Sequence, residues 1–316
     1  MTRTVLHRDD RGTFFDDAVD RVEGRRVSIG ALELASPVMP ASGCFGPELG
    51  RLIPVRELGA VVTKTVFAEP RGGNPPHRLT EIPAGMVNSV GIPSEGPEGY
   101  LRHLHPEYRS LGVPVIVSVG GHRTGEYARV LSVLADAGDA YELNVSCPNL
   151  DSEGVDIGAD PRAIEDAVGA ARRATGRPLI VKLPAMTSSI ADCARAAEAS
   201  GADAVCVSNS VPVLAIDPRD GRPALGNTIG GLSGATIRPL VSRLVWLTAR
   251  AVDIPVIACG GIGSARDALD YCGLGAAAVQ VGTASFARPW AMVEIARALT
   301  EDARPAIVAG EARGRV

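Results

Sequence analysis

Short apolar runs rich in β-branched residues recur along the chain, and most are followed by a segment with the 3.6-residue period of a helix. The runs are continuously apolar rather than alternating, as expected for parallel strands that are buried on both faces. The pattern predicts eight strands, at residues 38–39, 61–62, 115–117, 141–144, 179–181, 205–207, 256–258 and 278–281. It predicts helices at residues 126–137, 161–174, 190–200, 237–252, 265–272 and 289–299.

Eight strands alternating with helices predict an α/β fold, the (β/α)8 TIM barrel, over residues 27–300. A doubly wound open sheet is the alternative, and it is disfavoured because no GxGxxG motif follows the first strand. Residues 27–29 and 32–34 flank Gly30-Ala31 and predict an N-terminal hairpin that closes one end of the barrel. The long βα connections 67–101 and 211–236 are predicted to be lids or binding loops.

The two ends of the chain differ from the predicted barrel. Residues 1–26 are crowded with charge and form a predicted leader, whose order the sequence leaves open. Residues 301–316, dominated by Ala, Gly, Arg and Glu, are expected to be a frayed tail.

Composition excludes several classes of function. The 316 residues carry a net charge of −4, with arginines interspersed among acids, so we expect no nucleic-acid partner. No apolar run suits a signal peptide or approaches the length of a membrane span, which argues against a membrane location. The 6 cysteines include no CxxC pair, so neither zinc nor an iron-sulfur cluster is expected. The sequence therefore predicts a cytoplasmic protein with free thiols and no metal.

Rare polar residues stand at the ends of the predicted strands. Only two lysines, Lys64 and Lys182, occur among 32 basic residues, and both close apolar runs. Asn144 and Asn209 end two further strands, and Asn149 follows closely. Catalytic groups of a barrel project from this end, and several amides together match the C=O and N–H edge of a pyrimidine-like ring. The alternatives are chance survival for the lysines and the tying down of a loop for each asparagine.

Cys147 is a candidate reactive thiol. It heads a loop between Asn144 and Asn149, where exposure is expected, whereas Cys193, Cys206 and Cys272 fall on predicted helices or strands and are expected to be buried. A thiol is mostly protonated at neutral pH, so a general base needs a lysine, a dipole or the substrate to favour the thiolate. Lys64 is one candidate for that role.

Glycines follow the last two predicted strands. Gly260-Gly261 and Gly282-Thr283 each precede a helix, which is typical of the phosphate-binding corner of these barrels, where backbone N–H groups approach phosphate oxygens. The pattern predicts a phosphorylated cofactor or substrate, and residues 230–234 could add a further wall to that site.

Taken together, ordered motifs between residues 27 and 299 resemble the class 1 dihydroorotate dehydrogenases, flavin enzymes of pyrimidine biosynthesis. The motifs are MPASGCFG (39–46), EPR (69–71), GNPP (73–76), GMVNSVG (85–91), NVSCPN (144–149), GNTIGGLSG (226–234) and VQVGT (279–283). The resemblance implies an oxidoreductase in which Cys147 takes a proton from C5 of dihydroorotate while hydride leaves C6 for FMN, and Lys64 and the amides stabilise charge on the ring carbonyls.

The same resemblance implies which residues form the binding sites. FMN would be held by Ala41, Ser42, Lys64, Lys182, Ser208, Gly234, Gly260, Gly261, Gly282 and Thr283. Dihydroorotate would be held by Lys64, Asn88, Asn144, Asn149, Asn209 and Ser210, with backbone contributions near Gly91 and Ile92.

The stretches 215–217 and 226–239 resemble the form of the enzyme that pairs with an FAD and iron-sulfur subunit and passes electrons to NAD. The resemblance therefore implies a partner subunit, around a homodimer of this chain. Residues 211–214 (VPVL) and 235–236 (AT) depart from the family pattern, which leaves the exact substrate and electron acceptor open. The alternatives are a flavin oxidoreductase acting on another dihydropyrimidine or a secondary metabolite, a flavin-binding subunit without chemistry, and an isomerase or aldolase with Lys182 as a Schiff-base lysine.

Overall fold

The computed structural model describes residues 27–146 and 157–300. The predicted leader and tail lie outside the described residues.

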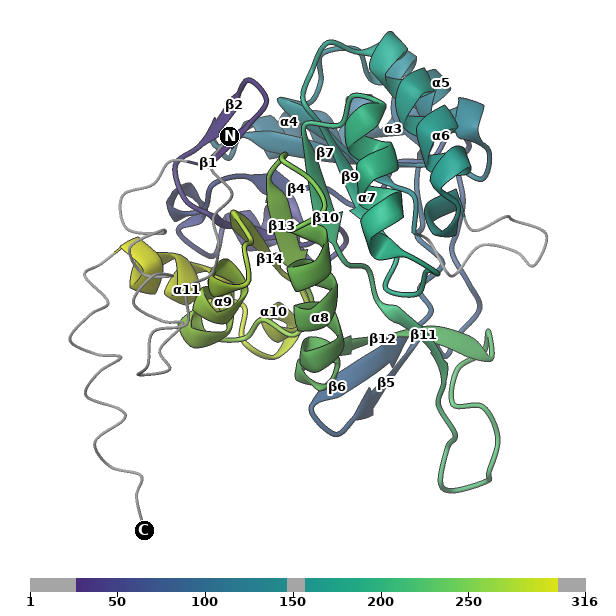
Figure 1. Cartoon of the computed structure of the whole chain (residues 1–316). Coiled ribbons are helices and arrows are strands. Elements are labelled where there is room, and N and C mark those ends of the chain that lie inside the picture. The colour runs from purple at the N-terminus through teal and green to yellow at the C-terminus, as the bar shows by residue number, and fades with distance from the viewer. Residues whose placement is uncertain (1–26, 147–156, 301–316) are drawn as a thin grey trace.

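Eight parallel strands form the centre of the molecule (Figure 1). In spatial order they are β3 (Val38–Pro40), β14 (Ala278–Val281), β13 (Val256–Cys259), β10 (Ala204–Val207), β9 (Leu179–Leu183), β8 (Ala140–Asn144), β7 (Val115–Gly120) and β4 (Val61–Val62). The two strands at the ends of this order meet, since Gly59, just before β4, donates its N–H to Val38 O in β3 at 2.9 Å. The predicted (β/α)8 barrel is therefore confirmed, and the open doubly wound sheet is wrong.

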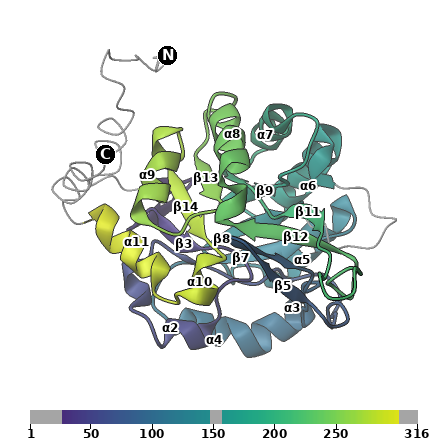
Figure 2. The ribbon, with the colours of Figure 1, turned by 90° about the horizontal axis from the view of Figure 1, so that it is seen from below.

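The helices surround this barrel, as Figure 2 shows from below. The long ones are α5 (Thr124–Leu134), α6 (Pro161–Ala174), α7 (Ile190–Ala199), α8 (Arg238–Thr248), α9 (Ala265–Gly273) and α11 (Ala291–Thr300). Short turns of helix are α2 (Pro47–Gly50), η1 (Val55–Glu57), α3 (Gly96–Gly99), η2 (Tyr100–Leu104), α4 (His105–Arg109), η3 (Ile157–Ala159), η4 (Ala235–Ile237) and α10 (Ala284–Ala287). Side-chain caps fix three of the long helices at their start: Asp160, Ser189 and Ser264 each accept a backbone N–H of the first turn.

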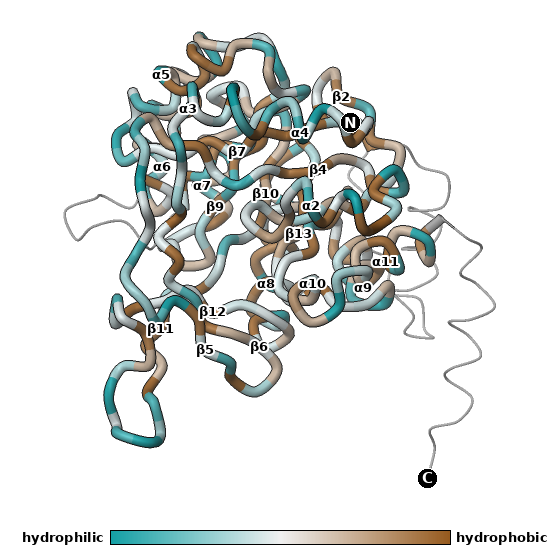
Figure 3. Tube along the Cα trace, turned by 180° about the vertical axis from the view of Figure 1, so that it is seen from behind, coloured by the Kyte–Doolittle hydropathy of each residue, from teal (hydrophilic) through white to brown (hydrophobic). Residues whose placement is uncertain are grey.

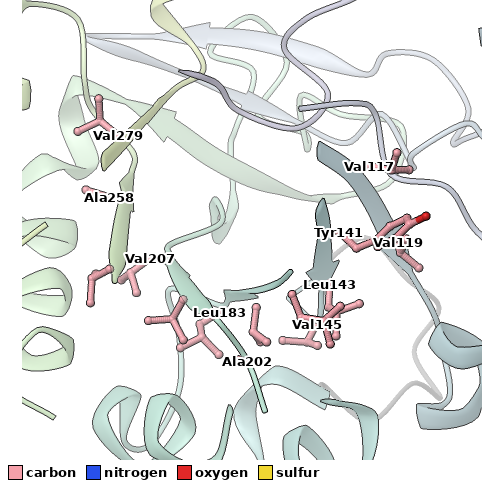
Figure 4. Close-up of a cluster of buried hydrophobic side chains, with 14 of the residues drawn as sticks. Val117, Val119, Tyr141, Leu143, Val145, Leu183, Ala202, Val207, Ala258 and Val279 are labelled. Carbon is pink, nitrogen blue, oxygen red and sulfur yellow. The ribbon is translucent and has the colours of Figure 1, made fainter. Parts of the chain in front are cut away.

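Alternate residues of each barrel strand face opposite sides and build two separate cores. The outer core lies between strands and helices, and Figure 4 shows Val117, Tyr141 and Leu143 among its side chains. The inner core fills the barrel with Met39, Ile116, Ile180, Ala204 and Ile257. Figure 3 shows the hydrophobic residues concentrated along these central strands.

The hairpin predicted at the start of the barrel is confirmed as β1 (Val27–Ile29) and β2 (Leu32–Leu34), paired antiparallel. Its turn residue Gly30 has φ +54, and a Cβ there would stand 2.7 Å from Oδ1 of Asp203, the residue just before β10. The hairpin therefore covers the end of the barrel where the strands begin, opposite to the functional end (Figure 1).

The two long connections are not irregular loops. They supply a four-stranded antiparallel sheet in the order β11 (Val211–Leu214), β12 (Ile229–Gly234), β6 (Gly85–Asn88) and β5 (Leu79–Ile82). The sheet lies over the end of the barrel opposite to the hairpin (Figures 1 and 2). Sequence reasoning missed β11 and β12 because Pro212 interrupts the first and Gly230 and Gly231 the second, although a proline is tolerated on an edge strand such as β11.

Within the described ranges, no helix is long and apolar enough to cross a membrane. The same part of the chain contains no group of three or more His, Cys, Asp or Glu side chains arranged to hold a metal ion.

Candidate active site

A cavity of about 780 Å³ lies between the carboxyl ends of the barrel strands and the four-stranded sheet. Its volume falls within the range of about 300–1,000 Å³ that is usual for sites of cofactors and small ligands. Every predicted site residue in the described part of the chain lines it: Ala41, Ser42, Lys64, Asn88, Gly91, Ile92, Asn144, Lys182, Ser208, Asn209, Ser210, Gly234, Gly260, Gly261, Gly282 and Thr283. Cys147 and Asn149 lie outside the described residues. The sequence therefore brings these distant segments to one place, while the roles assigned to them stay predictions.

Lys64 lies two residues beyond β4 on the wall of the cavity. Burial disfavours its ammonium form and lowers its pKa below the ordinary value of 10.5, and the nearby Cys44 thiol opposes this effect only in part. Cys44 also lines the cavity, and burial raises the pKa of its thiol to about 11. The Cys44 thiol is therefore protonated at neutral pH and is a poor candidate for a base.

An amide cluster joins three strand ends. Asn144, the last residue of β8, donates from Nδ2 to Thr65 Oγ1 at 3.3 Å, and its Oδ1 accepts from Ser146 Oγ at 3.1 Å. Asn209, beyond β10, donates from Nδ2 to Asn144 Oδ1 at 3.3 Å and to Ser146 O at 3.1 Å. Asn144 and Asn209 therefore both line the cavity and tie down a loop. The residue that they hold, Ser146, directly precedes Cys147.

The sheet contributes the opposite wall. Asn88 stands at the end of β6 and donates from Nδ2 to Gly231 O at 3.4 Å, which joins β6 to β12. Beyond it, Gly91 and Ile92 turn the chain with φ +75 and φ +45. The two connections that the sequence assigned to binding loops therefore do enclose the cavity, although as strands.

The glycines after β13 and β14 form an open corner of the cavity. Gly260 and Gly261 have φ +133 and φ +74, and a Cβ on Gly261 would lie 2.8 Å from Cβ of Arg238. Thr283 follows Gly282 and donates from Oγ1 to Ser233 Oγ of β12 at 2.8 Å. Of the predicted further wall at 230–234, only Ser233 and Gly234 line the cavity. A backbone free of side chains at this corner suits a phosphate group.

Beneath this cavity the structure reveals polar residues that sequence reasoning did not assign to the site. Glu142 and Gln280 lie on the same face of their strands as Ala140 and Ala278 of the inner core, so they face the inside of the barrel. Both are completely buried. Together with Lys182 they form a hydrogen-bonded chain inside the barrel. The sequence did contain a signal, since Glu142 is a lone acidic residue inside the apolar run at 140–143. An acidic side chain is rarely buried in a core unless it has a partner.

Comparison with known proteins matches the family model described as dihydroorotate dehydrogenase to residues 26–302. The chain belongs to this family. Among curated relatives, the catalytic subunit of dihydroorotate dehydrogenase B (NAD(+)) of Trichlorobacter lovleyi is 44% identical over 279 residues, which cover 87% of this chain and 92% of the relative. The subunits of the same name from Desulforamulus reducens and Bacteroides fragilis are 42% and 39% identical, each over 85% of this chain and 90% of the relative.

Membership of the dihydroorotate dehydrogenase family confirms the predicted class of enzyme, a flavin oxidoreductase that acts on a carbon–carbon single bond and uses FMN. The cavity fits such a cofactor, because it combines a glycine corner for the phosphate with the cationic side chain of Lys182 and a volume of about 780 Å³. A Schiff-base aldolase is correspondingly disfavoured, since Lys182 is engaged by Gln280 and Cys259 inside the barrel.

Proposed function

We propose that this chain is the FMN-bearing catalytic subunit of a two-subunit dihydroorotate dehydrogenase that passes electrons to NAD. The supporting observation is that the relatives named for this NAD-linked enzyme align over 85–87% of the chain, at 39–44% identity in the three compared above. A homodimer of this subunit, joined to an FAD and iron-sulfur subunit, is part of the same proposal.

The glycine corner would hold the phosphate of FMN, with Gly260, Gly261 and Gly282 leaving room for it and Thr283 beside it. Ala41 and Ser42 after β3, with Ser208 after β10, would line the ring, and Lys182 would approach it from inside the barrel. FMN, when bound, supplies the electron acceptor of the reaction.

Dihydroorotate would lie among Lys64, Asn88, Asn144 and Asn209, which converge on the cavity from four separate segments. Their amides can bind the ring carbonyl and N–H groups, while the Lys64 ammonium offsets the negative charge of the substrate. Cys147 would remove the proton from C5. Cys44 does not compete for this role, because its thiol is protonated.

The test of this function is the visible spectrum of the purified protein under anaerobic titration with dihydroorotate. We expect a yellow protein whose flavin band bleaches with dihydroorotate and not with dihydrouracil, which lacks the carboxylate. Bleaching by dihydrouracil alone would favour the related dihydropyrimidine enzymes. A colourless protein that forms a borohydride-trappable adduct would contradict the flavin function.

Binding of the product orotate should depend on the charge of Lys64. Below the lowered pKa of Lys64 the side chain is an ammonium and pairs with orotate, and as the pH rises through that pKa the proton and the attraction are lost. As the pH rises, we expect orotate affinity, read from the flavin band, to fall about ten- to a hundredfold. The fall should occur below pH 10.5, the ordinary pKa of lysine. The variant Lys64→Met should bind weakly at every pH. Affinity that stays constant to about pH 10 would remove Lys64 from substrate binding.

A further inference from the structure

The inside of the barrel contains a charged side chain that the proposed reaction does not use. Glu142 on β8 is 0% exposed, and its neighbours on the same face of the strands are the apolar side chains of the inner core. An isolated carboxylate in such a place is strongly disfavoured unless it is paired. Its partner is found on the next strand, where Lys182 of β9 is 2% exposed.

Gln280 of β14 connects the two charges from across the barrel. Lys182 donates from Nζ to Gln280 Oε1 at 2.9 Å, and Gln280 donates from Nε2 to Glu142 Oε2 at 2.5 Å. An ammonium can only donate and a carboxylate can only accept, so the two charges fix the orientation of the amide between them. Glu142 Oε1, which has no hydrogen-bond partner in the described part of the chain, lies 3.7 Å from Lys182 Nζ.

Of these three residues, Lys182 is the one that also lines the cavity. Its ammonium has three donors, and within the barrel it donates to Gln280 and, at 3.6 Å, to Cys259 Sγ. The remaining donor is available to a ligand in the cavity.

We infer that Glu142 is a positioning residue, which holds Lys182 charged and aimed at the cavity through the Gln280 amide. A fixed positive charge next to the flavin ring stabilises negative charge that gathers there on reduction. That benefit rests on the proposed function, whereas the charge on Lys182 does not depend on it.

The other titratable groups around Lys182 are thiols. Cys259 of β13, Cys206 of β10 and Cys44 beyond β3 face it, together with Glu142. Burial by itself would lower the pKa of Lys182, but the attraction of Cys259 and Glu142 raises it above its ordinary value. The pKa of Cys259 is lowered to about 7, chiefly by its hydrogen bond with Cys206. Cys259 is therefore the competing source of negative charge, and the experiment has to separate it from Glu142.

Lysine-selective isotope labelling makes this separation direct, because Lys64 and Lys182 give the only two side-chain signals, and Lys64→Arg assigns them. In the flavin-loaded protein we expect the Lys182 signal to stay that of an ammonium up to about pH 10. In Glu142→Gln it should titrate below about pH 9, because burial then outweighs the attraction that the Cys259 thiol still provides. Glu142→Asp should retain the charge, and the Lys64 signal should be the same in all three proteins.

Two results would overturn the inference. One is a Lys182 signal that remains charged in Glu142→Gln, and the other is a signal that titrates in Cys259→Ser instead. Both measurements are independent of turnover. A protein that fails to oxidise dihydroorotate can still support the inference, and a protein that oxidises dihydroorotate can still contradict it.

Protein folding provides a second measurement, in case Glu142→Gln is too unstable to label. If Glu142 serves as the countercharge of Lys182, the double variant Glu142→Gln with Lys182→Met should be more resistant to denaturant than Glu142→Gln alone, since no unpaired buried charge remains. If Lys182→Met folds but neither protein carrying Glu142→Gln does, Glu142 is needed for the barrel itself and the inference is wrong.

Discussion

Replacing Cys147 by alanine is expected to leave a folded, yellow protein whose flavin is reduced by dihydroorotate at least about a hundredfold more slowly. The reason is that a general base contributes on the order of 10² to 10⁴ to the rate, and alanine has no group that can accept the C5 proton. The measurement is the bleaching of the flavin band after rapid anaerobic mixing with dihydroorotate.

The matched control is Cys44→Ala, since Cys44 is one of the two described thiols that line the cavity, with Cys259, and its pKa is raised to about 11 by burial. A protonated thiol cannot take up a proton, so this variant should change the rate of flavin reduction by less than about tenfold. An unaltered rate in Cys147→Ala would remove Cys147 from the mechanism, and a large loss in Cys44→Ala alone would transfer the role to Cys44.

The barrel could be predicted because its strands are buried on both faces. Continuous apolar runs such as residues 179–181 need no information from elsewhere in the chain to be recognised, and the structure extends that run only to Leu183. Helix starts were accurate where a local signal exists: α6 begins at Pro161, as predicted, directly after the Asp160 cap. In contrast, α8 begins at Arg238 after a 3₁₀ turn, and ends at Thr248 rather than at the predicted 252.

The four-stranded sheet could not be predicted in the same way. Its pairs join segments far apart in the chain, such as Asn88 with Gly231, and its strands are only partly buried. Apart from the apolar VPVL of β11, no continuous apolar run marks them, because pairing with distant segments, rather than local preference, places these strands. Of the sheet residues that line the cavity, Asn88 and Gly234 were nevertheless predicted, since their motifs resemble those of the family, whereas Leu79, Glu81 and Ile82 of β5 were not.

The two lysines with which the site was first recognised have opposite surroundings. Lys64 has a lowered pKa because burial dominates, whereas Lys182 has a raised pKa because negative groups surround it. The sequence shows that both end apolar runs, but it cannot show that Glu142 and Gln280, 138 residues apart, meet across the barrel. Lys64 is therefore suited to carry a charge that changes when the substrate binds, and Lys182 is suited to carry a charge that does not change.

Replacing Asn144 by alanine is expected to weaken orotate binding and to slow flavin reduction by about a hundredfold, because a displacement of about 1 Å at a reacting group can cost that much. Asn144 ties Thr65, Ser146 and Asn209 together, and its side chain is buried. Loss of its amide leaves the backbone N–H of Ser146 without its acceptor and frees the residue before Cys147. A decrease of about 1–3 kcal/mol in the free energy of unfolding should accompany the change.

Asn227→Ala is the matched control for the Asn144 substitution, since Asn227 is exposed, lies outside the cavity and, among the described residues, donates from its side chain only to Ile229 O at 3.4 Å. Flavin reduction and orotate affinity should be unchanged in Asn227→Ala. If Asn144→Ala lowers the free energy of unfolding but leaves the rate of flavin reduction intact, the amide cluster only ties the loops together. If the rate falls while Asn227→Ala behaves as the parent protein, the cluster acts in the reaction as well as in the fold, by binding dihydroorotate or by holding the residue before the proposed base, because alanine at residue 144 changes no ionisable group.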